Sequence, residues 1–208
     1  MHRFRTHPRP TRRLLLAGAI LAATAQPAPA QASPEAVVER FHEALLGIMR
    51  QARQLGPRGR FERLQPAMQA AFDLPAMTRI AIGPPWSRME AAQQQALVQA
   101  FSDWSVATYA SRFDGFSGES FRTTGQSTLR NNDRMVQTAL DRPGNDPVQL
   151  NYLLRQSGGA WRIVDIYLTG SISELASRRA DFARVLAEGG ADRLIAELRQ
   201  RTARLLAG

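Results

Sequence analysis

The stretch WRIVDIYLTGSISELASRRADF, residues 161–182, decides the fold because it passes from a strand through a glycine turn into a capped helix. Aromatic and β-branched residues dominate 161–168, a composition typical of a largely buried strand. Gly170 ends the strand, and Ser171 precedes Glu174 by three residues, which is the spacing of a capping box at a helix start. Because both faces of the strand are apolar, we expect it to lie centrally in its sheet or to be covered on both sides.

The residues upstream of this stretch predict the rest of an antiparallel sheet. Segments 119–130 and 133–140 alternate with period two and predict a hairpin that turns near Asn131-Asn132. Segment 142–147 predicts a connection to the next strand that is wider than this hairpin turn. Apolar and polar residues then alternate over 148–154, as in a strand with one solvated face. Together with the strand described first, these segments predict about four strands.

The N-terminal part of the sequence is helical in its pattern. Ser33 precedes Pro34, which predicts a capped helix with Pro at its first position, and Gly56-Pro57 is expected to end it. A second helical segment is expected to be interrupted at Pro66. Asp73 is expected to cap a short third helix.

The remaining helices complete the architecture. Ser87 and Glu90 have the capping-box spacing and predict the longest helix of the chain, over 88–113. The glycines of GGADRL, residues 189–194, predict a connection between two C-terminal helices. The predicted fold class is therefore α+β, with N-terminal helices packed on a curved, mostly antiparallel sheet of about four strands that two C-terminal helices close.

Residues 1–30 have the composition of a cleaved export signal, with five Arg, no acidic residue and an apolar run from Leu14 to Ala25. This run is too short to span a bilayer, which needs about 20 apolar residues. Small residues permit cleavage after Ala30 or after Ala25, which leaves residues 31–208 as one predicted domain. The paired Arg12-Arg13 leaves both the general and the twin-arginine export routes open.

Charge and cysteine content exclude several classes of protein. The whole chain carries a formal charge of +9, but residues 31–208 hold 22 Arg against 18 acidic residues, which leaves +4. Nucleic-acid binding therefore loses its electrostatic support, and we expect no nucleic-acid partner. The absence of cysteine excludes disulfides and thiolate metal sites, and no motif for a cofactor or metal is present.

Several motifs together resemble the MlaC family of periplasmic lipid-binding proteins, and their pattern is most similar to its hopanoid-associated branch, HpnM. The resemblance covers roughly residues 34–205. The matching features are Trp161 with Asp165 four residues later, the Gly-Ser-Ile-Ser run, the Arg178-Arg179 doublet followed by Phe182, GGADRLIAEL at 189–198, FDLPAMTRIAIGPPWSRM at 72–89, and YASRF at 109–113.

The resemblance implies a periplasmic carrier rather than an enzyme. Its fold would enclose a deep apolar cavity between helices and sheet, and its ligand would be a phospholipid or, from the likeness to HpnM, a hopanoid. Proteins of the family exchange phospholipid with membrane complexes, so the implied partners are an inner-membrane transporter complex and an outer-membrane lipoprotein complex. No cofactor is implied.

The helix predicted over 88–113 has apolar residues on two faces, more than one core-facing side requires. The surplus, together with apolar strand positions, defines our candidate cavity wall. Its residues are Phe101, Tyr109, Phe113, Leu150, Tyr152, Leu154, Ile166 and Leu168. Arg178 and Arg179 are expected on the exposed side of the following helix, where they are candidates for contact with a partner.

An enzyme of isomerase or hydratase type, on a similar cone-shaped fold, is the alternative. Asp165 lies between apolar neighbours, and with a nearby Tyr it would act as acid or base in an apolar pocket. His42, the only His after residue 30, is expected to be a satisfied side chain beside an apolar helix face. Strand alternation separates the two functions, because a cavity lined by Ile166 and Leu168 excludes Asp165.

Overall fold

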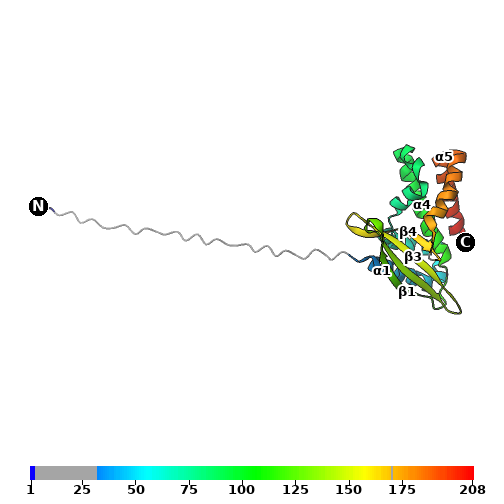
Figure 1. Cartoon of the computed structure of the whole chain (residues 1–208), viewed down its shortest axis with the longest axis horizontal. Helices are drawn as coiled ribbons and strands as arrows, with labels where there is room; N and C mark the ends of the chain where they lie inside the picture. The colour runs from blue at the N-terminus through cyan, green and yellow to red at the C-terminus, as the bar shows by residue number, and fades with distance from the viewer. Residues whose placement is uncertain (3–31, 170) are drawn as a thin grey trace. The chain divides into compact units, whose positions relative to one another are not determined.

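A computed structural model describes residues 1–2, 32–169 and 171–208. The predicted signal peptide with its cleavage sites and the turn at Gly170 lie outside these residues. Residues Gln31–Gly208 form one compact unit (Figure 1). Within the described part of the chain, no helix combines the length and apolar character needed to cross a membrane.

The first and third helices start where the sequence predicts, whereas the predicted end of the first lies inside the second. The α1 helix (Pro34–Arg50) begins at Ser33, whose hydroxyl accepts a hydrogen bond from Ala36 N. The α3 helix (Leu74–Ile82) begins at Asp73, whose carboxylate accepts one from Ala76 N. Between them, α2 (Ala52–Ala71) contains the predicted stop as a kink, because Gly56 has φ 62° and ψ −179°.

Pro66 does not interrupt α2, which corrects the prediction. A Pro inside a helix costs about 3 kcal/mol because it removes one hydrogen bond and crowds the preceding turn. Leu64 and Met68, on either side of it, are fully buried, and each such side chain contributes about 1.5–3 kcal/mol. Burial of the helix face therefore outweighs the local penalty.

The α4 helix (Ala91–Arg112) starts three residues later than predicted. Pro84–Arg88 forms a 3-10 turn, and the Ser87 hydroxyl donates to Pro84 O instead of capping a helix. The capping box uses Glu90 and Gln93, with Glu90 N donating to Gln93 Oε1 at 3.3 Å. Among the described residues α4 is still the longest uninterrupted helix, as predicted, because α5 (Glu174–Ala207) is two helical segments joined at a kink at Gly189 and Gly190.

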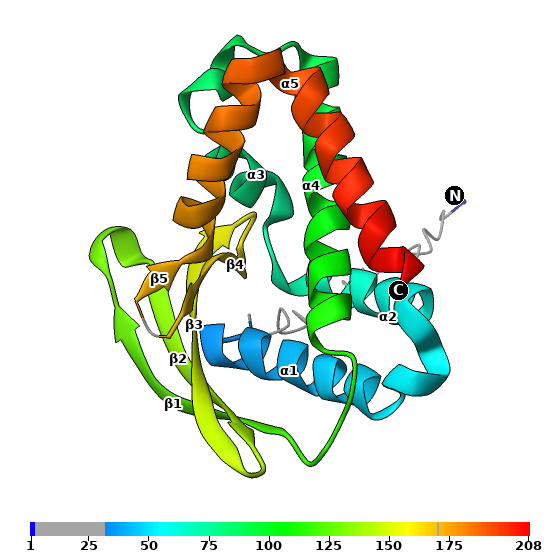
Figure 2. The same cartoon turned by 90° about the vertical axis from the view of Figure 1, so that its right-hand side faces the viewer.

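Five strands form one open antiparallel sheet in the order β1-β2-β3-β4-β5. The hairpin of β1 (Ser120–Thr128) and β2 (Arg134–Arg142) is as predicted. The predicted wide loop before β3 (Asn145–Ser157) is instead a two-residue turn, because Arg142 pairs directly with Asn145 and Gly144 has φ 74°. Figure 2 shows α1 crossing one face of this curved sheet.

The strand quoted first becomes β4 (Ala160–Leu168), which is second from the edge rather than central. The fifth strand, β5 (Ile172–Ser173), pairs with one end of β4 and covers part of its edge. The N-cap of α5 is Ser173 rather than the predicted Ser171, and the Ser173 hydroxyl accepts a hydrogen bond from Ala176 N. Asp73 N donates to Ile163 O and covers another part of the β4 edge. Flanking segments therefore bury the middle of the strand without a central position.

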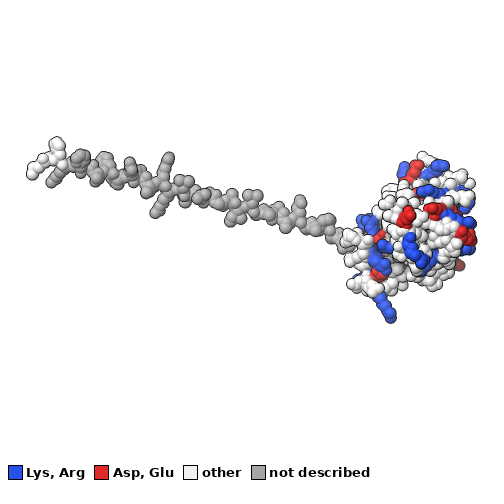
Figure 3. All heavy atoms as spheres, turned by 90° about the horizontal axis from the view of Figure 1, so that it is seen from above, with Lys and Arg blue, Asp and Glu red and all other residues white. Residues whose placement is uncertain are grey.

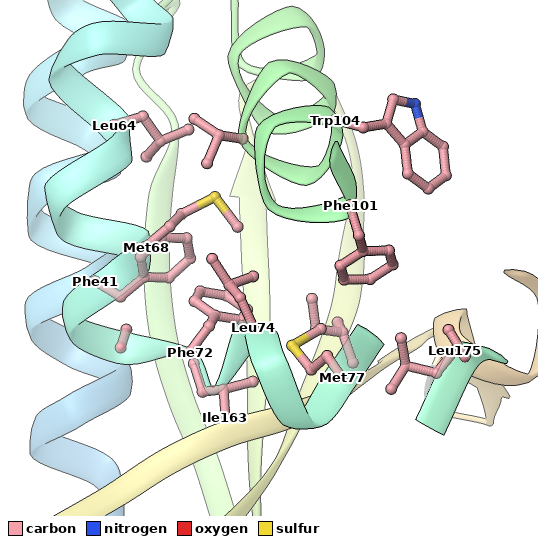
Figure 4. Packing of buried hydrophobic residues seen from close by; sticks show 14 of the residues in the cluster. Phe41, Leu64, Met68, Phe72, Leu74, Met77, Phe101, Trp104, Ile163 and Leu175 are labelled. Atoms are coloured by element: carbon pink, nitrogen blue, oxygen red, sulfur yellow. The ribbon is translucent and has the colours of Figure 1, made fainter. Parts of the chain in front are cut away.

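The helical layer is held together by α4 and the two arms of α5 (Figure 2). Gly190, with φ 68°, kinks α5 and confirms the connection predicted between two C-terminal helical segments. Phe101 and Phe182 pack edge to face across α4 and α5, 6.2 Å between ring centres. Phe41 packs edge-on against Phe72 at 4.9 Å (Figure 4). These aromatic contacts join the helices that surround the candidate site.

Candidate functional site

A cavity of about 540 Å³ lies between the second half of α4, the start of α5 and strands β2 to β4. Its volume falls in the range of pockets that hold small ligands, about 300–1,000 Å³. Five buried apolar side chains, supplied by the first four helices and the residue that follows α2, form the part of its wall that we call the floor, and Ser105 of α4 is a buried polar residue of the wall. The floor residues are Met49, Met68, Phe72, Met77 and Phe101.

The outer part of the wall, which we call the rim, carries charged side chains, of which Glu174 and Arg178 are only 17% and 18% exposed. It includes the end of α4, the loop that leads to β1, the end of β2 and the start of α5. The ionisable rim residues are Arg112, Asp114, Glu119, Arg142, Glu174 and Arg178. The cavity is thus graded from apolar floor to charged rim, which suits a molecule with an apolar body and a polar end.

Six of the eight predicted wall residues line this cavity: Phe101, Tyr109, Phe113, Leu150, Ile166 and Leu168. Tyr152 and Leu154 do not line it, which corrects their assignment. Both belong to the same face of β3 as Leu150, but they are fully buried in the packed core beyond the end of the cavity. Alternation identifies the face of a strand, whereas the length of the cavity along that strand depends on the helices above it.

Sequence reasoning missed the floor that the first three helices supply. Met49, Met68 and Met77 lie on apolar helix faces, and nothing in their spacing distinguishes a core position from a cavity position. Figure 4 shows Met68 on α2 and Met77 on α3. Methionine is unbranched and flexible, so it adapts to irregular apolar surfaces. The only available signal was the presence of these three methionines in helices expected to cover the sheet.

Arg178 does not face solvent, which corrects its assignment as an exposed partner contact. Its side chain is only 18% exposed, and its guanidinium carbon lies 3.9 Å from the centre of the Trp104 ring. Nη2 donates to Glu174 Oε2 at 3.1 Å. Burial lowers the pKa of Arg178, and Glu174 opposes this shift. Arg179 is exposed, as predicted.

Tyr109 contributes a hydroxyl group to the cavity wall. Burial raises the pKa of Tyr109 well above its usual value, and the charge of Glu174 raises it further. Its ring stacks on Phe113, 5.6 Å between ring centres. The hydroxyl has no hydrogen-bond partner among the residues that the structure describes, so it is available to a ligand.

Asp165 has a structural position. Its carboxylate accepts hydrogen bonds from Ile166 N at 2.8 Å, Ser173 Oγ at 2.5 Å and Leu175 N at 3.2 Å, so it fixes the start of α5 to the sheet. It does not line the cavity, whereas its neighbour Ile166 does. The geometry that the enzyme alternative requires is therefore not present at this residue.

His42 is buried and satisfied, as expected. Its Nε2 is 2.9 Å from the Tyr152 hydroxyl, and its ring stacks on Phe121 with 3.9 Å between ring centres. Burial lowers the pKa of His42 to about 3, so the imidazole is neutral at physiological pH. Within the described ranges, no group of three His, Cys, Asp or Glu residues is arranged to hold a metal ion.

Comparisons with known proteins support the fold and identify the family of this chain. The chain resembles a solved structure of a phospholipid-binding protein from Ralstonia solanacearum in complex with a phospholipid, at 23% identity and a TM-score of 0.74, with 84% of this chain and 99% of that chain covered. None of the curated proteins searched matches the chain. The model of the MlaC protein family matches residues 39–200, most of the chain. This protein belongs to the MlaC family.

Proposed function

We propose that this protein is a non-enzymatic lipid carrier that holds the apolar part of a lipid in the cavity and shields it from water. The observation that carries the proposal is the graded cavity of about 540 Å³, with an apolar floor and a charged rim. Lipids have the same two-part chemistry. Membership of the MlaC family and the similarity to a phospholipid-binding protein support this assignment.

Burial of hydrocarbon is sufficient to retain such a ligand. Each methylene removed from water contributes about 0.8 kcal/mol, so ten buried methylenes contribute about 8 kcal/mol. A hydrocarbon chain that moves from a bilayer into the cavity exchanges one apolar environment for another. The carrier therefore needs no chemical step, and its direction of transfer depends on its partners.

The cargo, the location and the partners are parts of the same proposal. The cargo is a phospholipid, as in the solved relative, with a hopanoid as the alternative from the likeness to the HpnM branch. The carrier works in the periplasm after export by the segment 1–30, and it shuttles lipid between an inner-membrane transporter complex and an outer-membrane lipoprotein complex. Arg and acidic side chains are interspersed on the face seen in Figure 3. Exposed Arg179 remains our candidate for contact with a partner.

Native mass spectrometry of protein purified gently from its own envelope tests the proposal. We expect a complex with one lipid, which solvent extraction then identifies. Leu150→Trp, which adds bulk inside the cavity, should reduce lipid occupancy severalfold. Gln149→Trp is the matched control, because Gln149 is the exposed neighbour on the opposite face of β3. Equal occupancy in the two variants, or a protein that is always free of lipid, would contradict a carrier function for this cavity.

A further inference from the structure

Two guanidinium groups share one carboxylate at the rim. Glu174 Oε2 accepts from Arg178 Nη2 at 3.1 Å, and Glu174 Oε1 is 4.0 Å from Arg112 Nη1. The three side chains form a series from inside to outside, because Glu174 and Arg178 are 17% and 18% exposed whereas Arg112 is 54% exposed. This cluster of Arg112, Glu174 and Arg178 has a net charge of +1.

The donors of this cluster are largely unused. A guanidinium has five N–H donors, and among the described residues Arg178 donates one hydrogen bond, to Glu174. Within the described ranges, Arg112 makes only the long ion pair with the same carboxylate. The Tyr109 hydroxyl, also on the cavity wall, has no partner in the described part of the chain. Tyr109 and the three residues of the cluster all line the same cavity.

The other charged rim residues have separate surroundings. Glu119 accepts a hydrogen bond from Ser117 N at 2.5 Å, within its own loop. Arg142 donates to Asp146 O at 2.9 Å, across the β2–β3 hairpin. Asp114 is exposed to solvent, where water screens its charge. By contrast, the Trp104 ring under Arg178 fixes the position of that guanidinium and limits its access to water.

We propose that the anionic group of the bound lipid, a phosphate or a carboxylate, binds between Arg112 and Arg178 and accepts a hydrogen bond from the Tyr109 hydroxyl. Planar guanidinium groups suit the paired oxygens of such anions. The anion neutralises the net charge of the cluster and satisfies donors that have no other partner. This inference rests on the proposed carrier function and narrows its cargo to lipids with an acidic group, which excludes uncharged hopanoids.

A competition experiment tests this selectivity. Delipidated protein is incubated with phosphatidylcholine vesicles that contain equal small amounts of phosphatidylglycerol and diacylglycerol with identical acyl chains. The vesicles are removed, and mass spectrometry gives the ratio of the two lipids on the protein. We expect enrichment of phosphatidylglycerol. Because both lipids come from the same vesicle, attraction of the protein to the vesicle surface cancels in this ratio.

Two substitutions with opposite effects on charge separate recognition from structure. Both Arg112→Gln and Glu174→Gln break the same ion pair, but the first removes the net positive charge and the second doubles it. We expect Arg112→Gln to lower the ratio of phosphatidylglycerol to diacylglycerol by about fivefold, which is the upper end of the effect of one half-exposed charge pair. We expect Glu174→Gln to raise this ratio. Arg58→Gln and Glu62→Gln change net charge equally at exposed sites outside the cavity and should leave the ratio unchanged.

The possible outcomes distinguish a lipid headgroup from a free anion as the ligand of this site. They also distinguish a failure of this inference from a failure of the proposed carrier function. Inorganic phosphate should lower the ratio by competing with the lipid headgroup. If phosphate binds without changing the ratio, the site serves a free anion and the inference is wrong. It is also wrong if both substitutions shift the ratio in the same direction, or if wild type takes up both lipids equally. A protein that takes up no lipid from the vesicles, phosphatidylcholine included, contradicts the carrier function itself.

Discussion

The buried His42 predicts a specific dependence of stability on pH. The pKa of His42 is about 3 in the folded protein and 6.5 for an unperturbed His. Between these values the unfolded chain binds a proton that the folded protein does not, so stability is complete above pH 6.5 and falls as the pH decreases toward 3. A pH of 5 lies about 1.5 units below 6.5, and each unit corresponds to about 1.36 kcal/mol. The free energy of unfolding is therefore expected to be about 2 kcal/mol lower at pH 5 than at neutral pH.

Urea unfolding at pH 7.5 and pH 5 measures this loss. His42→Gln is the control, because an amide offers a partner to the Tyr152 hydroxyl and does not titrate. We expect the variant to be less stable than wild type at pH 7.5 by about 1–2 kcal/mol, since it loses the stack on Phe121. Between pH 7.5 and pH 5 it should lose about 2 kcal/mol less than wild type. An equal loss in both proteins would show that His42 is not protonated on unfolding in this range, and the reasoning would be refuted.

Two further predictions concern the elements that frame the cavity. Asp165→Ala leaves the donors of Ser173 and Leu175 without their acceptor. Thermal unfolding should therefore show a loss of roughly 3 kcal/mol in the free energy of unfolding, while the lipid occupancy of the folded protein stays unchanged. Lost occupancy at normal stability would instead reveal a contact between Asp165 and the ligand. Gly83→Ala should lower the free energy of unfolding by about 2 kcal/mol, because Gly83 has φ 70° and ψ −145° and a Cβ there would lie 2.8 Å from Arg179 Nη2. Gly47→Ala has open space inside α1 and should raise the free energy of unfolding by about 0.5–1 kcal/mol. Similar effects at both glycines would exclude backbone strain as the cause.

Local signals in the sequence were sufficient to predict much of the fold. Ser33 and Asp73 cap their helices as expected. In both helices a Pro in the first turn, Pro34 after Ser33 and Pro75 after Asp73, marks the start. The fold class and the first hairpin also follow from hydrophobic period and turn residues. The start of α5 was misplaced by two residues, because Ser171 and Ser173 both offer a hydroxyl and only the tertiary bond to Asp165 selects Ser173.

Features that depend on distant segments could not be predicted. A bulge near Leu153 shifts the register of β3 and β4, so that Ile163 and Ile166 both join the core although simple alternation places them on opposite faces. The α2 helix continues through Pro66 because its buried face outweighs the local cost. Strand alternation predicts Tyr152 and Leu154 in the cavity wall together with Leu150, but the packing of the helices ends the cavity before them.

The placement of Arg178 shows the same limit at the candidate site. A doublet of arginines on an amphipathic helix usually faces solvent, and Arg179 does. Arg178 instead lies over the Trp104 ring of α4, a contact between residues 74 positions apart that no local pattern indicates. The cluster that carries our further inference was therefore visible only in the folded chain.

Photochemical labelling by a bound lipid tests the central claim most directly. A phospholipid with a diazirine near the end of one acyl chain is loaded into the delipidated protein and activated by light, and the labelled peptides are mapped by mass spectrometry. We predict labels on the floor residues Met49, Met68, Phe72 and Met77, reduced severalfold by Leu150→Trp. Labels confined to exposed surfaces, with the floor unmarked, would contradict the claim that the cavity holds lipid hydrocarbon.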